Sequence, residues 1–349
     1  MLKHLRSALD DTSPHQERKI AAIYLLLLAF NAAVWTWAFI ALSDSPTLLG
    51  TALLAYVLGL RHAVDADHIA AIDNVVRKLM QEGKRPVSAG LFFSLGHSLV
   101  ITIAVAVIVG TAFALQGRLH PFKVIGSVIG TATSAFFLLS IAAINLIILR
   151  GVWSSFQRAR RGEPVADHEL DQLLAGRGLL ARIFRPLFRM VTRSWHMFAI
   201  GFLFGLGFDT ATEISLFTVA GSQASGGLSS ATVMIFPALF AAGMTLVDTS
   251  DSVLMVGAYG WAFINPERKL WYNLTITAAS VLVALLIGSI EALGLLAAHF
   301  NLSGAFWIAI SNLNGDLASF GVVVVGLLLI SWIVSAMIYR WRSGDLIPD

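Results

Sequence analysis

Runs of about 20 mostly apolar residues recur along the whole chain, and this feature constrains the fold more than any other. A transmembrane α-helix needs about 20 consecutive apolar residues to cross the hydrocarbon core of a bilayer. We therefore predict an all-α polytopic membrane protein with eight transmembrane helices. The expected spans cover residues 20–42, 48–76, 87–114, 124–149, 196–221, 232–262, 271–297 and 319–340. The second and sixth spans are longer than a simple crossing needs, so we expect them to tilt or break.

The composition excludes several other classes of protein. Of the residues, 57% are hydrophobic and only 13% are charged, whereas a soluble domain carries about 25% charged residues. The chain has no cysteine, which excludes disulfides, thiolate metal sites and iron–sulfur clusters. Any bound metal must therefore use nitrogen and oxygen ligands. The first apolar run is longer than the roughly 7–15 residues of a signal-peptide core, so we predict no cleavable signal peptide.

The lysines and arginines lie almost entirely on one side of the predicted spans. Of the 24 such residues, 21 fall in the two tails and in the loops after spans two, four and six. Only Arg118 and Lys123 lie on the opposite side, and Arg61 lies inside span two. Because basic loops stay in the cytoplasm, both termini are predicted to be cytoplasmic. These charges are spread over loops, so the net charge of +3 does not indicate nucleic-acid binding.

The chain is predicted to form a single transmembrane domain, residues 1–349, with one sizeable Arg-rich loop at residues 150–195. The end of this loop, residues 178–193, has apolar residues on one helical face and arginines on the other. This pattern is typical of a helix that lies in the membrane interface and contacts lipid headgroups; a solvated basic connector is the alternative. The chain has no GxxxxGK(S/T) motif, so nothing indicates nucleotide hydrolysis or an ATPase subunit.

Polar and ionisable side chains occur inside the predicted spans, where they are costly and mark candidate functional sites. At a rise of about 1.5 Å per residue, side chains from several spans lie at overlapping depth. These polar side chains are Asn31 in span one, Arg61, His62, Asp65, Asp67, His68 and Asp73 in span two, His97 in span three, Asp209, Thr210 and Glu213 in span five, and Asp248 and Asp251 in span six.

The polar stretch of span two predicts a metal site. On a regular helix, His62, Asp65 and His68 spread over an arc of about 120° and share one face. Imidazole and carboxylate ligands without thiolates suit nickel, cobalt or zinc. Asp67, Asp73 and Arg61 are then expected to support these ligands or line the ion path. Spacing alone leaves open which carboxylate binds the ion, and the alternative is that these groups form salt bridges that hold helices together.

Other polar positions allow two interpretations each. His97 is a ligand, a proton acceptor or a hydrogen-bonded core histidine. Asn31 either shapes the metal site from span one or bonds to a neighbouring helix. Glu291, near the outer end of span seven, is expected to reach water. The glycine pairs at 126/130 and 201/205 have the small-xxx-small spacing that indicates close helix packing.

Four segments of the chain resemble the motifs of the nickel/cobalt transporter family of high-affinity permeases. They are LRHAVDADHIAAIDN in span two, LFFSLGHS in span three, LGFDTATE in span five and GMTLVDTSD in span six. The motifs occur in order and without departure, and the resemblance covers nearly the whole chain. It also agrees with eight helices and a large basic cytoplasmic loop.

The resemblance implies uptake of nickel, cobalt or both across the bacterial inner membrane, by a permease and not by an enzyme. It assigns the metal-binding positions to His62, Asp65, Asp67 and His68. The acids that the family places in later helices correspond to Asp209, Glu213, Asp248 and Asp251. The family also suggests that the surroundings of the first histidine tune nickel against cobalt, which draws attention to Asn31 and Val64.

The expected mechanism is alternating access, with the ion held near mid-membrane and no cofactor. Two positive charges crossing 100 mV gain about 4.6 kcal/mol, so the membrane potential can drive accumulation without an obligatory proton. One alternative is transport of another divalent metal, such as zinc or manganese, or export. A second is an intramembrane metallohydrolase, although the chain lacks HExxH. The oligomeric state and the preference between nickel and cobalt stay open.

Overall fold

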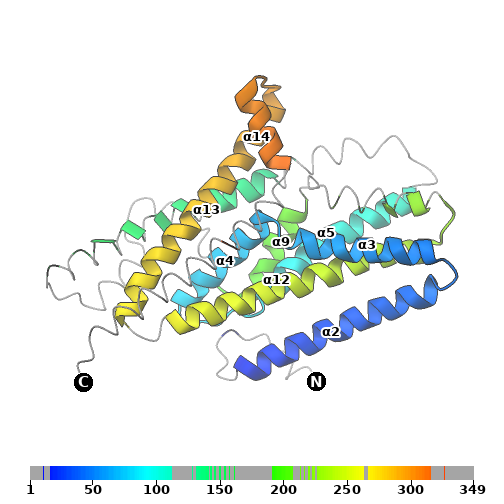
Figure 1. Ribbon diagram of the computed structural model, residues 1–349, viewed down its shortest axis with the longest axis horizontal. Coiled ribbons are helices and arrows are strands. Elements are labelled where there is room, and N and C mark those ends of the chain that lie inside the picture. Colours follow the sequence, from blue (N-terminus) through cyan, green and yellow to red (C-terminus); the bar gives the residue numbers. More distant parts are fainter. Residues whose placement is uncertain are drawn as a thin grey trace.

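The computed structural model describes residues 11, 16–111, 191–206, 226–262 and 266–315, with scattered positions between 128 and 161, between 213 and 224, and at 326. Within these residues every regular element is a helix, which confirms the all-α membrane class. The helices are α2 (Gln16–Ala41), α3 (Pro46–His62), α4 (Ala66–Gln81), α5 (Ala89–Thr111), the 3-10 turn η1 (Ser194–His196), α9 (Met197–Gly205), α11 (Ser230–Val233), α12 (Ile235–Ala262), α13 (Pro266–Phe300) and α14 (Ala305–Gly315) (Figure 1).

Four stretches of the described chain are long and apolar enough to cross a membrane, and α3 with α4 make a fifth if the bent pair is one span. The four are Gln16–Ala41, Ala89–Gly110, Ser230–Gly260 and Thr277–Phe300. They correspond to predicted spans one, three, six and seven. Spans four and five are described only in part, where they contain the shorter apolar helices Thr131–Ser140 and Ser194–Gly205. Span eight and the interfacial helix 178–193 fall largely outside the described residues. The count of eight and the cytoplasmic termini therefore stay predictions.

Span two is bent, as its excess length indicated. α3 ends at His62, α4 begins at Ala66, and the two axes differ by 50°. Asp65 precedes α4 with extended backbone angles (φ −63°, ψ 144°) in the N-cap position, where aspartate is a preferred residue. The regular helix assumed in calculating the 120° arc is therefore wrong. The direction of each side chain in this stretch depends on the break.

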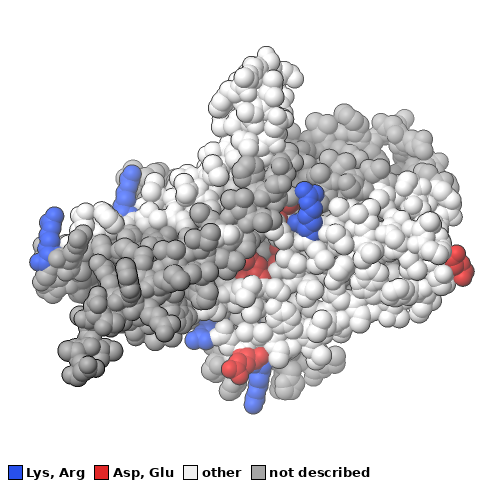
Figure 2. Space-filling view, viewed as in Figure 1, with Lys and Arg blue, Asp and Glu red and all other residues white. Residues whose placement is uncertain are grey.

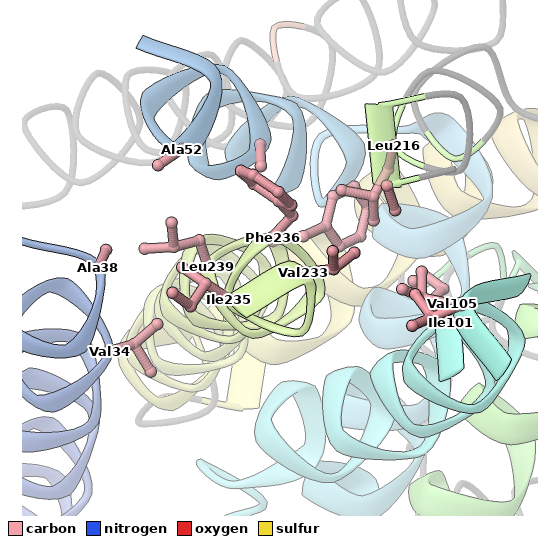
Figure 3. Close-up of a cluster of buried hydrophobic side chains, with 14 of the residues drawn as sticks. Val34, Ala38, Ala52, Ile101, Val105, Leu216, Val233, Ile235, Phe236 and Leu239 are labelled. Atoms are coloured by element: carbon pink, nitrogen blue, oxygen red, sulfur yellow. The ribbon is translucent and has the colours of Figure 1, made fainter. Parts of the chain in front are cut away.

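The helix α12 lies at the centre of the described bundle and packs against α2, α3, α4 and α5. Figure 3 shows Val34 and Ala38 of α2 on one side of α12, and Ile101 and Val105 of α5 on another. Large apolar side chains also cover the outside of the bundle; Leu25, for example, is 72% exposed. In Figure 2 most of the described surface on the visible face carries no charge. Such a surface suits a lipid environment, where apolar side chains face hydrocarbon.

Glycines allow several helices to touch through their backbones. A Cβ added at Gly201 of α9 would lie 1.9 Å from the carbonyl oxygen of Phe93 in α5, and one at Gly205 would lie 3.0 Å from that of His97. The close packing predicted from the Gly201/Gly205 spacing is confirmed. The pair at 126/130 lies outside the described residues. These contacts set the distance of α9 from the face of α5 that carries His97.

Two details near the C-terminal end of α13 differ from the sequence predictions. Glu291 is only 3% exposed and accepts a hydrogen bond of 3.0 Å from the Ser134 hydroxyl, so the prediction that it reaches water is wrong. The helix α14, which was not predicted, follows α13 and projects at the top of the molecule in Figure 1. Its 11 residues are too few for a span, so the presence of apolar runs of membrane length does not predict this helix.

Candidate metal centre

Three imidazoles meet in the interior of the bundle. His62 is the last residue of α3, His68 lies in the first turn of α4, and His97 is in the middle of α5. One ring nitrogen from each lies within 4.8 Å of the others. The ring centroids are separated by 4.6 Å for His62 and His68 and by 4.8 Å for each pair with His97. None of the three side chains is more than 3% exposed, so the cluster is shielded from the surroundings of the protein.

The break in span two brings two of these histidines together. Because α3 stops at His62 and the chain restarts as α4 in a new direction, His68 approaches His62 from a separate helix. The connection is tight: the backbone N–H of Val64 donates to the carbonyl of Arg61 at 3.0 Å, and that of Asp65 donates to the carbonyl of His62 at 2.9 Å. The third histidine arrives through the packing of α5 against α12.

Carboxylates hold the rear nitrogen of two of the rings. Asp65 Oδ2 lies 2.9 Å from His62 Nδ1, and Asp248 Oδ2 lies 3.3 Å from His68 Nδ1. A carboxylate at one ring nitrogen fixes the orientation and tautomer of an imidazole and leaves the other nitrogen available to a metal. His68 Nε2 has no hydrogen-bond partner in the structure. The two rings therefore present Nε2 toward the centre of the cluster.

The front nitrogens are spaced for a common ion. His62 Nε2 and His97 Nε2 are 2.9 Å apart. Two nitrogens bound to one ion at about 2.1 Å each, at right angles, lie about 3 Å apart. Square-planar and octahedral sites both contain such right-angle pairs. The spacing therefore matches two adjacent ligands of one divalent metal.

A further carboxylate borders these front nitrogens. Glu213, which belongs to predicted span five and is 1% exposed, places Oε1 3.0 Å from His97 Nε2 and 3.8 Å from His62 Nε2. A negative group at this distance offsets the charge of a cation in a medium of low dielectric constant. The cluster thus joins three imidazole rings to three carboxylates, those of Asp65, Asp248 and Glu213.

Aromatic rings enclose the histidines. Phe93 of α5 packs edge-on against His68, with ring centroids 4.8 Å apart, and Phe240 of α12 lies 5.4 Å from His62. Neither residue is among those predicted from the sequence. Phe93 precedes His97 by four residues and so shares its helix face, a signal that was available. Phe240 could be found only once α12 was packed against α3.

The remaining predicted residues of span two divide between the cluster and its surroundings. Asp67 lies in the first turn of α4, and its Oδ1 is buried without a hydrogen-bond partner. Val64 is half-buried in the break, whereas Arg61 is exposed and forms no ion pair with a described residue. Asp73 lies further along α4 and accepts hydrogen bonds from the hydroxyls of Tyr259 and Ser280. These contacts place Asp73 away from the three imidazoles.

Residues predicted from the other spans are also accounted for. Asn31 donates to the carbonyls of Leu27, at 2.9 Å, and Ala242, at 3.3 Å, so it bonds to the neighbouring α12. Asp251 lies one turn beyond Asp248 and keeps Oδ2 buried without a partner. Asp209 and Thr210 lie outside the described residues.

The chain is similar to known transport proteins over most of its length. A family model described as high-affinity nickel-transport protein matches residues 48–338. The chain is 56% identical to the high-affinity nickel transport protein of Cupriavidus necator over 94% of this chain and 93% of that relative. It is 46% identical to a nickel transporter of Staphylococcus aureus over 94% of each chain. It is 38% identical to a cobalt transport protein of Rhodococcus rhodochrous over 82% and 81% of the two chains. No solved structure gives a significant match.

Proposed function

The chain belongs to the high-affinity nickel-transport protein family, and on this premise we propose that it takes up nickel or cobalt ions across the bacterial inner membrane by alternating access. The relatives are transporters, so the protein is a permease and not an enzyme, and the metal is its cargo and not a cofactor. Relatives named for nickel and for cobalt both match the chain. The comparisons do not favour the metallohydrolase or a permease for zinc or manganese.

One observation carries the proposed ion site: the 2.9 Å separation of the front nitrogens of His62 and His97, with the unpartnered Nε2 of His68 beside them. We propose these three nitrogens as ligands. Asp65 and Asp248 orient the rings of His62 and His68 from behind. Asp67, with a buried carboxylate oxygen that lacks a partner, stays the candidate for an oxygen ligand.

The charge balance supports transport of a divalent cation. A bare ion of this charge would be prohibitively costly inside a bilayer, and nearby carboxylates offset that cost. Glu213 borders the nitrogens directly, and Asp65 and Asp248 act through the rings. The membrane potential adds about 4.6 kcal/mol per 100 mV for two inward-moving charges. Neither a nucleotide nor a coupled proton is needed for accumulation on this scale.

The break in span two offers a way to release the ion. His62 and His68 belong to separate helices joined by three residues, Ala63 to Asp65. A small change in the angle between α3 and α4 would move the ring nitrogens of His62 and His68 apart, so that they no longer bind the same ion. Asp251 and Asp73, further along α12 and α4, are then placed to line the path that the released ion takes toward the end of α4.

The proposal is tested by uptake of radiolabelled nickel into proteoliposomes with an inside-negative potential, with cobalt, zinc and manganese as competitors. We expect His62→Ala and His97→Ala to abolish uptake and Asp67→Asn to weaken it. The matched control is His299→Ala, because His299 is an exposed histidine at the end of α13. Full uptake by both His62→Ala and His97→Ala would overturn the proposed site, and stronger competition by zinc than by cobalt would overturn the proposed cargo.

A further inference from the structure

We propose that Ser94 of α5 is a positioning residue for metal binding, which holds the carboxylate of Asp248 where it can orient the ring of His68. The inference rests on the proposed function, since it assigns His68 to the ion. Ser94 is fully buried, and its hydroxyl donates a hydrogen bond of 2.5 Å to Asp248 Oδ2. The same oxygen lies 3.3 Å from His68 Nδ1. One carboxylate oxygen therefore links a serine on α5 to a histidine on α4.

Apart from its contact with His68, the carboxylate of Asp248 is held by the hydroxyl of Ser94. The other carboxylate oxygen, Oδ1, is buried and has no hydrogen-bond partner. A carboxylate with one satisfied oxygen is free to turn about its side-chain bonds when one of the two contacts is lost. Without Ser94, His68 would be oriented by a group that is itself not fixed. Ser94 therefore acts through Asp248 and does not need to touch the ion.

The backbone packing of α5 against α12 makes this short contact possible. A Cβ added at Gly90, one turn before Ser94, would lie 1.9 Å from the carbonyl oxygen of Asp248. The N–H of Gly90 donates to the Ser252 hydroxyl at 2.6 Å, and that hydroxyl donates to the carbonyl of Asp248 at 3.2 Å. Two helices in backbone contact leave room for a small side chain only, and serine is small and carries a donor.

The arrangement also ties two of the proposed ligands to one helix face. His97 follows Ser94 by three residues on α5, so the two side chains lie on the same face. A shift of α5 that moves His97 therefore also moves the support of His68. The helix α5 thus sets the spacing of the ligands on both sides of the ion, directly through His97 and indirectly through Ser94 and Asp248.

The test measures binding of Ni²⁺ to the purified full-length protein by isothermal titration, together with the KM and maximal rate of uptake. We expect Ser94→Ala to weaken nickel binding about tenfold, the lower end of the range for partners outside the ligand set, and to raise KM with little change in maximal rate. The matched control is Ser88→Ala, because Ser88 is also fully buried but its hydroxyl has no partner. It should bind nickel like the unsubstituted protein.

A double-mutant cycle separates positioning from a general packing effect. If Ser94 acts through Asp248, Ser94→Ala should cause no further loss of affinity in the Asp248→Ala background. Should Ser94→Ala fail to fold, Ser94→Cys keeps the volume and a weak donor and should give an intermediate affinity. Additive losses in the cycle, or an affinity of Ser94→Ala equal to that of Ser88→Ala, would overturn the inference.

The variant His68→Ala distinguishes this inference from the function on which it rests. Nickel binding that survives His68→Ala unchanged would show that the proposed ligand set is wrong. Binding that is lost in His68→Ala while Ser94→Ala binds normally would leave the ligand set standing and refute the role of Ser94 alone.

Discussion

A substitution at Gly59 should disturb the metal centre without touching any proposed ligand. Gly59 lies on α3, three residues before His62, where α3 meets α12. A Cβ built at this position would lie 2.1 Å from the carbonyl oxygen of Phe240, whereas ordinary contact begins near 3.4 Å. The obstacle is backbone, which cannot rotate away, so Gly59→Ala must move α3 from α12 by roughly the difference, 1.3 Å.

The size of the effect follows from this displacement. Overpacking of this kind costs about 1–3 kcal/mol of folding stability. The same movement carries His62 away from its neighbours, and a binding constellation tolerates only about 0.5 Å of error. Gly59→Ala should therefore lower both the stability and the nickel affinity, although His62, His68 and His97 are all retained.

Gly50 provides the matched control on the same helix, because a Cβ there meets nothing within 4 Å. Gly50→Ala should be neutral or stabilise α3 by up to about 1 kcal/mol through its better helix propensity. The assays are thermal unfolding in detergent without metal and isothermal titration with Ni²⁺. If Gly59→Ala unfolds at the same temperature as Gly50→Ala and binds nickel equally well, the backbone contact between α3 and α12 is not what positions His62.

Three further predictions concern other parts of the molecule. Nickel affinity should fall as the pH is lowered, because protons compete with the metal for imidazole nitrogen; titrations at several pH values in which binding tightens toward acid would exclude histidine ligands. Tyr259→Phe removes a hydroxyl donor to the buried Asp73 carboxylate, and it should lower the free energy of unfolding by about 1.5–3 kcal/mol; unchanged chemical denaturation would contradict this. Asp11→Ala removes a buried carboxylate that accepts 2.7 Å and 2.6 Å bonds from the backbone and hydroxyl of Ser194, and it should cost about 1–3 kcal/mol while leaving nickel affinity intact. Asp44→Ala, at an exposed aspartate, should have no effect on thermal unfolding.

The position of the break in span two was only partly predictable. The excess length of the apolar run indicated a bend, and Asp65 is a residue type that commonly precedes a helix. No proline or glycine marks the point, however, and the side chain of Asp65 contacts His62 instead of capping α4. The contact became visible only once the two helices were placed at 50° to each other.

The role suggested for His97 shows the same limit. The sequence left it open whether His97 was a ligand or a core histidine, since 35 positions separate it from His62. Nothing local relates two residues at that distance along the chain. Packing through Gly90, Gly201 and Gly205 fixes the position of α5 relative to α12 and α9. This position brings His97 Nε2 next to His62 Nε2.

The sequence by itself determined that this chain is a helical membrane protein with histidines and acids inside its spans, because hydrophobicity and its period depend only on the order of residues. The four motifs also determined the family, which the comparisons confirmed. Only the tertiary structure decided which nitrogens face one another and which carboxylates stand behind them. Metal coordination depends on side-chain directions to within a fraction of an ångström, and these directions follow from a helix break and from glycine contacts between helices far apart in the chain.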